Sequence, residues 1–273
     1  MMNVKLTATL VCSSLFLSAC ANNMSTNDML SLGTSGVQAL TLSDSQLRDT
    51  ANQSCAQMDK ANNVAAANSK YTKRLNNIKK GLPTSIDGVP LSFKVYQVRD
   101  INAWAMPNGC IRVYSGLMDM MTDDEVRGVL GHEIGHVIAR HHEERITRQM
   151  GAQAGLGVLG ALAGARYGEG AANTVNQLGG MTAQAAFLLP GSRTQESEAD
   201  VVGQRLMAQA GFDPRQAVGL WQNMMAASAN RPPQWLSTHP DPANRIRELE
   251  RDAPSLVPTY EAARKAGNVP KCG

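Results

Sequence analysis

The chain has 273 residues and a formal net charge of +3, with a sequence pI near 8.6. So mild a positive charge gives no support to a nucleic-acid-binding function, and the length allows one sizeable core together with an export segment. Aromatic residues make up only 4% of the chain, whereas Ala, Gly and Met are plentiful, which favours a helix-rich fold packed through small side chains.

Residues 1–19 have the pattern of a bacterial export signal. Lys5 supplies a positive start, and residues 6–17 form an apolar stretch too short to span a bilayer. The stretch ends in the lipobox-like LSAC, which predicts cleavage before Cys20 and stable anchoring by several acyl chains on this residue. An ordinary secretory signal with an incidental Cys20 is the alternative. Ala21 stands where an aspartate would retain a lipoprotein in the inner membrane, which favours an outer membrane lipoprotein facing the periplasm.

Residues 20–42 are polar and rich in Asn, Ser, Thr and Gly, and we interpret them as the lipidated N-terminus and a flexible tether. Residues 43–80 are expected to be helical, with Asn68 as a possible break. Residues 91–95 alternate between apolar and polar side chains and are expected to form a strand.

The Asn-Gly pair at 108–109 predicts a β-hairpin between two further strands. The first arm, residues 102–105, is a candidate sheet edge. An edge strand can pair with an extended peptide, but an ordinary hairpin without a partner fits the residues equally well.

One predicted helix carries the motif that says most about function. Thr122 and Glu125 form a capping box, and apolar residues then recur at helical spacing through the sequence HEIGH. His132 and His136 lie four residues apart, so both imidazoles leave one face of the helix and can hold one zinc ion. Glu133 lies beside them, where it can accept a proton from a zinc-bound water.

Two residues compete to be the third zinc ligand, and the first is His142. It has the spacing of the third histidine in metzincins, but that motif requires the chain to turn away at position 139. Ala139 and Arg140 are good helix formers, so we expect the helix to continue. His141 and His142 would then be exposed residues of a basic helix end.

Glu196 is the better candidate for the third ligand. Ser192 and Gln195 predict the start of a second helix, on which Glu196 and Asp200 share a face. Glu196 can complete a His-His-Glu zinc site, and Asp200 can accept the free N–H of a ligating imidazole. Glu198 points elsewhere and is expected to be a surface acid. The alternative is that the whole acidic cluster is a solvated helix N-terminus.

The remaining segments carry weaker signals. Residues 151–180 are too short and too rich in glycine to span a bilayer, and we interpret them as a mobile lid or a pair of small-residue helices, with an ordinary packed helix as the alternative. Pro214 opens a helix whose apolar face is expected in the core. His239 lies just before a short helix that begins at Pro242. A histidine in such a loop is usually a surface or structural residue.

Cysteine usage agrees only in part with an oxidising compartment. Once the signal is removed and Cys20 is lipidated, Cys55, Cys110 and Cys272 remain. Because three is an odd number, one thiol is free or pairs with another chain.

Three motifs, taken in order, resemble a known family. They are HEIGH at 132–136, ESEAD at 196–200, and THP at 238–240 followed by Arg245. The run NAWAMPNGCIRVYSGL, which begins at residue 102, also belongs to the resemblance. In these motifs the chain is similar to the zinc metallopeptidases of the HtpX, BepA and LoiP group, which are gluzincins and take their third zinc ligand from a glutamate of a second helix.

The resemblance implies a helix-rich α+β metallopeptidase domain of the zincin type, with a small mixed β-sheet, over residues 43–252 and a C-terminal tail at 253–273. It also implies one Zn²⁺ per chain and a set of residue roles. The zinc ligands would be His132, His136 and Glu196, and Glu133 would be the general base. Asp200 would support one of the ligands. His239 and Arg245 would stabilise the transition state or cap the metal. Substrate backbone would pair with Asn102, Ala103, Trp104 and Ala105, and Cys55 would form a disulfide with Cys110.

We therefore expect a zinc endopeptidase that is anchored by lipid in the bacterial envelope and cleaves extended or misfolded polypeptides in protein quality control. Its partners would be these substrates, the membrane and other envelope proteases or assembly factors, but no nucleic acid. One alternative is a chaperone-like binding module for outer-membrane proteins, whose latent protease activity is held in check by His239. A structural zinc lipoprotein agrees less well with Glu133, because a structural site needs no base and normally has four protein ligands.

Overall fold

The structure is a computed structural model, and it describes residues 43–170, 191–228, 233–240 and 242–268. The predicted signal, the lipidation site Cys20, the tether and Cys272 lie outside the described residues. The described elements are α2 (Asp44–Ala61), α3 (Lys70–Ile78), β1 (Ser85–Ile86), β2 (Val89–Pro90), β3 (Ser92–Tyr96), β4 (Ala103–Ala105), β5 (Cys110–Tyr114), α4 (Ser115–Met120), α5 (Asp123–Ile138), α6 (His141–Tyr167), α9 (Arg193–Gln209), α10 (Gln216–Ser228), α11 (Gln234–Thr238) and α12 (Pro242–Lys265).

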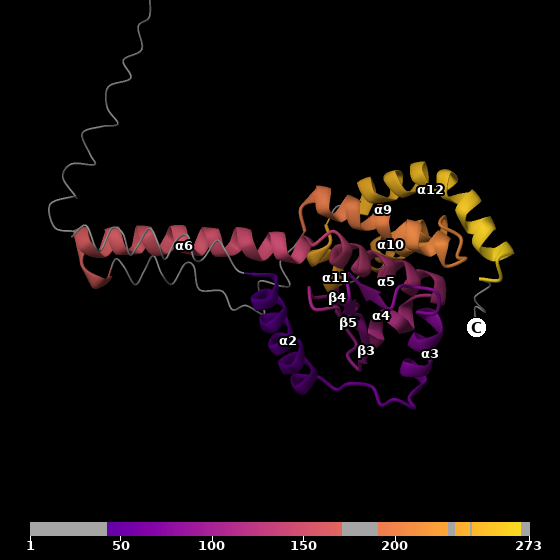
Figure 1. Cartoon of the computed structure of the whole chain (residues 1–273), viewed down its shortest axis with the longest axis horizontal. Coiled ribbons are helices and arrows are strands. Elements are labelled where there is room, and N and C mark those ends of the chain that lie inside the picture. The colour runs from indigo at the N-terminus through magenta and orange to yellow at the C-terminus, as the bar shows by residue number, and fades with distance from the viewer. Residues whose placement is uncertain (1–42, 171–190, 229–232, 241, 269–273) are drawn as a thin grey trace, which may run out of the picture. The chain divides into compact units, whose positions relative to one another are not determined.

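The chain divides into two compact units. Among the described residues, those from 147 to 170 belong to the first unit, and those from 43 to 146 and from 191 to 268 belong to the second, so helix α6 begins in the second unit and continues into the first. The second unit contains helices on both sides of α5 together with small sheets (Figure 1). It confirms the expected helix-rich α+β fold.

A three-stranded mixed sheet supports one side of the second unit. Its strand order is β3-β5-β4, with β3 parallel and β4 antiparallel to β5. Gly109 has a φ of 77° at the hairpin between β4 and β5, a conformation that glycine adopts without a steric cost. The predicted hairpin is therefore present, and its first arm is at the edge of the sheet. Ala103, Trp104 and Ala105 in this arm are all buried.

The segment expected to be helical over residues 43–80, with Asn68 as a possible break, is two helices, and Asn68 lies in the turn before the second one. Helix α2 ends at Ala61, and an extended stretch around Val64 and a turn at residues 67–68 lead into α3. The reason is tertiary: the backbone N–H of Ala65 donates to Val95 O, at 2.8 Å, and the N–H of Gln97 donates to Asn63 O, also at 2.8 Å. Pairing with strand β3 satisfies backbone groups that a helix would otherwise satisfy.

Helix α5 is the centre of the core. It packs against β4 on one side and against α9 and α10 on the other, and Figure 1 shows it between these layers. Its capping box is present, with the side chain of Thr122 accepting from Glu125 N and the side chain of Glu125 accepting from Thr122 N. Apolar side chains of α5 and of the elements around it form one buried cluster. The helix is buried on all sides, so its polar side chains must find partners inside the protein.

The C-terminal end differs from the expected short helix and tail. Helix α12 continues without interruption from Pro242 to Lys265, and Ala253 within it is buried. The predicted boundary between residues 252 and 253 therefore falls inside a helix. Pro254 and Pro258 also lie within α12, although proline normally predicts a helix end.

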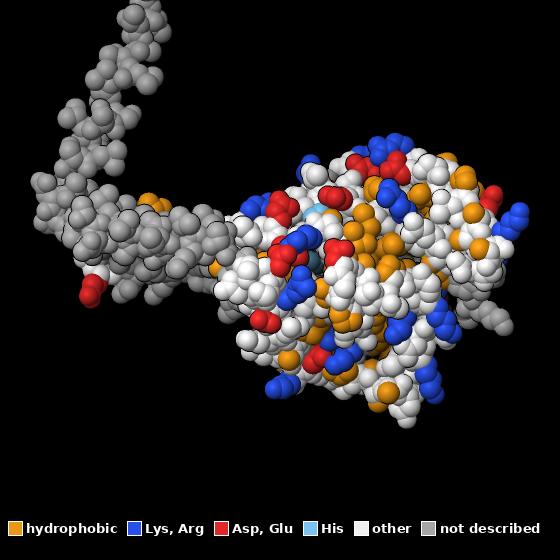
Figure 2. All heavy atoms as spheres, viewed as in Figure 1, with side chains coloured by type: hydrophobic (Ala, Val, Ile, Leu, Met, Phe, Trp, Pro, Cys, Tyr) orange, Lys and Arg blue, Asp and Glu red, His pale blue; other side chains and the backbone are white. Residues whose placement is uncertain are grey.

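None of the helices in the described ranges is long and apolar enough to cross a membrane. On the face shown in Figure 2, acidic and basic side chains are interspersed over the described surface, and histidine contributes little of it. The histidines are instead directed inward, where they meet around one point.

Candidate metal centre and active site

Helix α5 supplies two of the side chains that meet where the histidines converge. His132 and His136 are 1% and 0% exposed, and their Nε2 atoms are 3.0 Å apart. Burial, together with the neighbouring ring of His132, lowers the pKa of His136 to about 3. The ring of His136 is therefore neutral at pH 7 and has a nitrogen lone pair available.

Helix α9 supplies the third side chain. Its N-terminus has the predicted capping box between Ser192 and Gln195, and Glu196 in its first turn is completely buried. Glu196 Oε2 lies 3.5 Å from His132 Nε2, and Glu196 Oε1 lies 3.4 Å from His136 Nε2. Among the described residues, Glu196 Oε1 has no hydrogen-bond partner, which is costly for a buried carboxylate oxygen.

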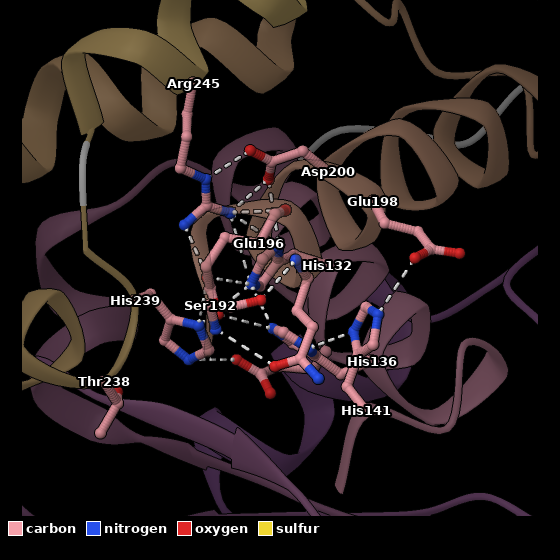
Figure 3. Close-up of polar contacts among 12 residues, drawn as sticks. His132, His136, His141, Ser192, Glu196, Glu198, Asp200, Thr238, His239 and Arg245 are labelled. Carbon is pink, nitrogen blue, oxygen red and sulfur yellow. Dashed lines mark hydrogen bonds and ion pairs between the residues drawn. The ribbon is translucent and has the colours of Figure 1, made fainter. Parts of the chain in front are cut away.

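His239 brings a fourth donor atom from the loop after α11. Its Nδ1 lies 2.9 Å from Glu196 Oε2 and 3.1 Å from His132 Nε2. Burial lowers the pKa of a histidine, but the carboxylates of Glu196 and Glu133 outweigh this and raise the pKa of His239 to about 9. The loop histidine is therefore a buried member of the cluster, beside Glu196 (Figure 3).

The four donor residues fit a zinc ion. One nitrogen or oxygen atom from each of His132, His136, Glu196 and His239 lies within 4.8 Å of the others. Tetrahedral zinc with metal–nitrogen distances of about 2.0–2.1 Å separates its ligand atoms by about 3.3–3.4 Å, close to the separations found here. The free Oε1 of Glu196 also fits, since a metal would satisfy it. Imidazole and carboxylate together are donors that zinc accepts.

Glu133 lies beside this cluster and is 1% exposed. Trp235 Nε1–H donates to its Oε1 at 3.1 Å, and His239 Nε2 lies 3.3 Å from the same oxygen. Burial alone would raise the pKa of Glu133, but the charge and hydrogen bond of His239 hold that pKa at about 2. The side chain is therefore an ionised carboxylate with a fixed orientation, as a general base requires.

Asp200 and Arg245 lie behind His132. Asp200 Oδ1 is 3.0 Å from His132 Nδ1, and because a carboxylate can only accept, the imidazole donates from Nδ1 and leaves its Nε2 free for a metal. Arg245 donates to Asp200 Oδ2 at 2.6 Å and to Glu196 Oε2 at 2.8 Å. Its guanidinium also lies over the ring of Trp221, 3.7 Å from the centroid. Arg245 thus donates to the carboxylates of both Asp200 and Glu196.

His141 and His142 are not exposed, and this prediction is wrong. Helix α5 ends at Ile138, and Arg140 has a φ of 57°, which turns the chain into α6 at His141. The side chain of Arg140 pairs with Asp44 of α2, a contact from outside the segment. His141 and His142 are consequently 2% and 3% exposed. His142 is not part of the cluster of donor atoms formed by His132, His136, Glu196 and His239.

A cavity of about 180 Å³ opens beside Glu133 and His239. The edge-strand residues Asn102, Ala103, Trp104 and Ala105 line it, and so do His142, Arg145, Gln234 and Thr238. The structure thus brings the candidate substrate strand to the candidate base. Arg245 does not line this cavity.

Cys55 of α2 and Cys110 of β5 lie at bonding distance, with Cα atoms 6.5 Å apart. This is the pair that the family resemblance implies. It connects α2 to the strand next to the edge strand β4.

Sequence reasoning missed Trp235 and His141. Trp235 lies 102 residues from the carboxylate that it contacts, and a tryptophan in the short helix α11 carries no local sign of that role. The sequence predicts an exposed His141, because the turn at Arg140 contains no residue type that indicates a turn.

The comparisons with known proteins agree with this geometry. The sequence pattern of peptidase family M48 matches residues 70–253. Metalloprotease YcaL of Escherichia coli is 38% identical over 251 residues, which cover 91% of this chain and 97% of YcaL. Metalloprotease LoiP of E. coli is 39% identical over 227 residues, covering 83% and 88% of the two chains. The human mitochondrial metalloendopeptidase OMA1 is 31% identical over 176 residues, covering 62% of this chain and 33% of OMA1. These matches confirm the resemblance seen in the motifs, and the chain belongs to peptidase family M48, whose members are metallopeptidases.

Proposed function

We propose that this protein is a zinc-dependent endopeptidase in which His132, His136 and Glu196 hold the metal. The observation that carries the proposal is the ionised carboxylate of Glu133 between this donor cluster and the cavity. A zinc ion bound there would polarise the scissile carbonyl and activate water.

Glu133 then acts as the general base. It takes the proton of the attacking water and passes it to the nitrogen of the leaving amine. The N–H of Trp235 keeps the carboxylate oriented, and Asp200 keeps His132 in the tautomer that presents Nε2 to the metal. His239 faces both Glu133 and Glu196, where it can donate a hydrogen bond to the developing oxyanion.

The experiment compares zinc content and cleavage of an unfolded model protein by wild type, Glu133→Gln and Glu196→Ala, each beginning at Ala21. Wild type should bind one zinc ion per chain. Glu133→Gln should keep the metal and lose about 10²–10⁴-fold in rate, whereas Glu196→Ala should lose both metal and activity. Unchanged zinc affinity in Glu196→Ala would show that the ligand set is wrong.

The substrate class that we propose is an extended polypeptide bound along β4. An edge strand lining the cavity offers backbone groups to a peptide strand, which gives affinity with little demand on sequence. Peptides N-methylated on alternate backbone nitrogens test this. Methylation of the peptide nitrogens that face β4 should raise KM. Methylation of the nitrogens that face away from β4 is the control. Equal effects on both faces would contradict strand pairing.

We further propose lipidation at Cys20, an outer-membrane location facing the periplasm and a Cys55–Cys110 disulfide. These rest on the lipobox-like sequence, the residue after it and the approach of the two cysteines. Labelled palmitate should be incorporated by wild type and not by Cys20→Ala, and the label should fractionate with the outer membrane. Misfolded envelope proteins are then the available substrates, which is the basis for a role in quality control.

A second candidate function is a chaperone-like binding module with latent protease activity. The observation in its favour is His239, which is close enough to the three ligand side chains to act as a fourth protein ligand. His239→Ala distinguishes the two functions: cleavage should fall if His239 stabilises the transition state and rise if it caps the metal. In cells, Glu133→Gln should abolish the role of a protease and preserve the role of a binding module.

A further inference from the structure

His141 lies on the side of His136 that faces away from the metal cluster. Its Nδ1 is 2.9 Å from His136 Nδ1, and its Nε2 is 3.3 Å from Glu198 Oε2 (Figure 3). The ring of His141 is 2% exposed, whereas the side chain of Glu198 is 57% exposed. A chain of three side chains thus runs from the surface of α9 through the start of α6 to a candidate zinc ligand on α5.

The chemistry of these groups allows only one arrangement of protons when a metal is bound. The carboxylate of Glu198 can only accept, so His141 Nε2 carries a proton and donates it. His136 must present the Nε2 lone pair to the metal, so its own proton is on Nδ1. The remaining atom, His141 Nδ1, has a lone pair and accepts that proton. Each of the two close contacts then has one donor and one acceptor.

We propose that His141 is a positioning residue for the metal site, which holds His136 with its Nε2 facing the metal and is itself oriented by Glu198. The inference rests on the zinc site of the proposed function. In this arrangement both candidate histidine ligands donate their Nδ1 proton to a neighbouring side chain. Asp200 accepts the proton of His132, and His141 accepts the proton of His136. Such partners fix the ring and raise its basicity, and their loss typically weakens metal affinity about 10–100-fold.

The turn at Arg140 is what makes this arrangement possible. If α5 continued as a regular helix, residue 141 would lie five positions beyond His136 and its side chain would leave about 140° around the axis. The left-handed conformation of Arg140 instead starts α6 at His141 and brings the two rings to a centroid distance of 5.0 Å. A residue conformation that is unusual for arginine thus serves the site.

The test is a competition of the full soluble chain against a zinc chelator, comparing wild type with His141→Ala, His141→Asn and Glu198→Ala. His141→Ala should weaken zinc affinity about 10–100-fold. Asparagine places its Oδ1 where the imidazole has Nδ1, so His141→Asn should recover most of that loss. Glu198→Ala should cost less than about tenfold, because water can replace a carboxylate that is this exposed.

His142→Ala is the matched control for losing a buried imidazole. The ring of His142 lies 5.8 Å from that of His136, and its Nδ1 has no hydrogen-bond partner among the described residues. The His142→Ala variant should bind zinc nearly as tightly as wild type. Far-ultraviolet circular dichroism establishes that each variant is folded before its affinity is compared.

Several outcomes separate the inference from the proposed function. Wild type that binds no zinc would overturn the metal site and the inference with it. Wild type that binds zinc no more tightly than a folded His141→Ala would overturn the inference alone. If His141→Ala and His141→Asn lost zinc affinity equally, His141 would act by packing and not by accepting a hydrogen bond, which would also overturn the inference. In the zinc-loaded wild type, nitrogen-15 spectra of the histidine rings should show His136 protonated at Nδ1 and His141 at Nε2, and the opposite tautomer of His141 would refute the arrangement.

Discussion

Gly203 allows helix α9 to approach helix α5 closely, and Gly203→Ala tests whether this approach sets the geometry of the metal site. A Cβ atom at position 203 would lie 2.7 Å from the backbone nitrogen of His132 and 2.8 Å from the carbonyl carbon of Gly131. The shorter of these is about 0.8 Å less than an ordinary contact of about 3.5 Å. Because both atoms belong to backbone, no side-chain rotation can relieve the overlap, and the two helices must separate.

The expected effect on stability is small because two terms oppose each other. Overpacking costs about 1–3 kcal/mol, and replacing glycine by alanine within a helix returns about 1 kcal/mol, so the variant should lose about 0–2 kcal/mol. The effect on the site should be larger. Helix α9 carries Glu196, and a shift of about 0.8 Å exceeds the tolerance of about 0.5 Å for such constellations. We expect at least a tenfold loss in zinc affinity and about a 100-fold loss in kcat/KM.

Gly219→Ala in α10 is the matched control. Its new Cβ would meet only the side chain of Glu125, at 3.3 Å and 4.0 Å, so it should be neutral or stabilise by up to about 1 kcal/mol. Urea unfolding gives the stability of both variants, chelator competition gives zinc affinity, and peptide cleavage gives kcat/KM. If Gly203→Ala matched Gly219→Ala in all three, the close contact would not set the ligand positions and the reasoning would be refuted.

Three further predictions concern the core, the base and the metal. Asp59 pairs with the buried guanidinium of Arg112, so Asp59→Asn should lower the free energy of unfolding by about 3 kcal/mol. Partial burial works against ionisation of Asp59, but the hydrogen bonds from Arg112 hold its pKa well below the usual value. The stabilisation that Asp59 gives the folded state is therefore present above about pH 4 and declines as the pH falls further. In urea unfolding, the free energies of unfolding of wild type and variant should become equal in acid. Trp235→Phe removes the hydrogen bond that Trp235 donates to Glu133, and a hydrogen bond to a charged group is worth about 1.5–3 kcal/mol. The variant should lower kcat/KM about 10–100-fold without changing zinc affinity. An unchanged kcat/KM would show that Trp235 does not orient the base. Chelation of zinc present at 1,000 times its Kd should remove about 4 kcal/mol of stability, and a Tm that ignores both zinc and chelator would contradict a bound metal.

The two helices that carry the candidate ligands could be predicted from the sequence because their signals are local. Thr122 with Glu125 and Ser192 with Gln195 are capping boxes that need only three residues of chain, and both are present in the structure. The spacing of His132 and His136 likewise fixes their relation through helix geometry alone. The Asn-Gly turn follows the same logic, since the turn conformation depends on neighbouring residues.

Tertiary structure decided everything that joins distant segments. His239 reaches Glu133 from 106 residues along the chain, and Trp235 reaches it from 102 residues; no pattern in neighbouring residues encodes such a contact. Arg140 turns the chain although its own residue type favours helix, and its side chain pairs with Asp44 of another helix. The sequence by itself thus determined which residue types could hold a metal and on which faces they lie. The packing of α9, α11 and the start of α6 against α5 determined that they meet, because burial of apolar surface overrides weak local propensity.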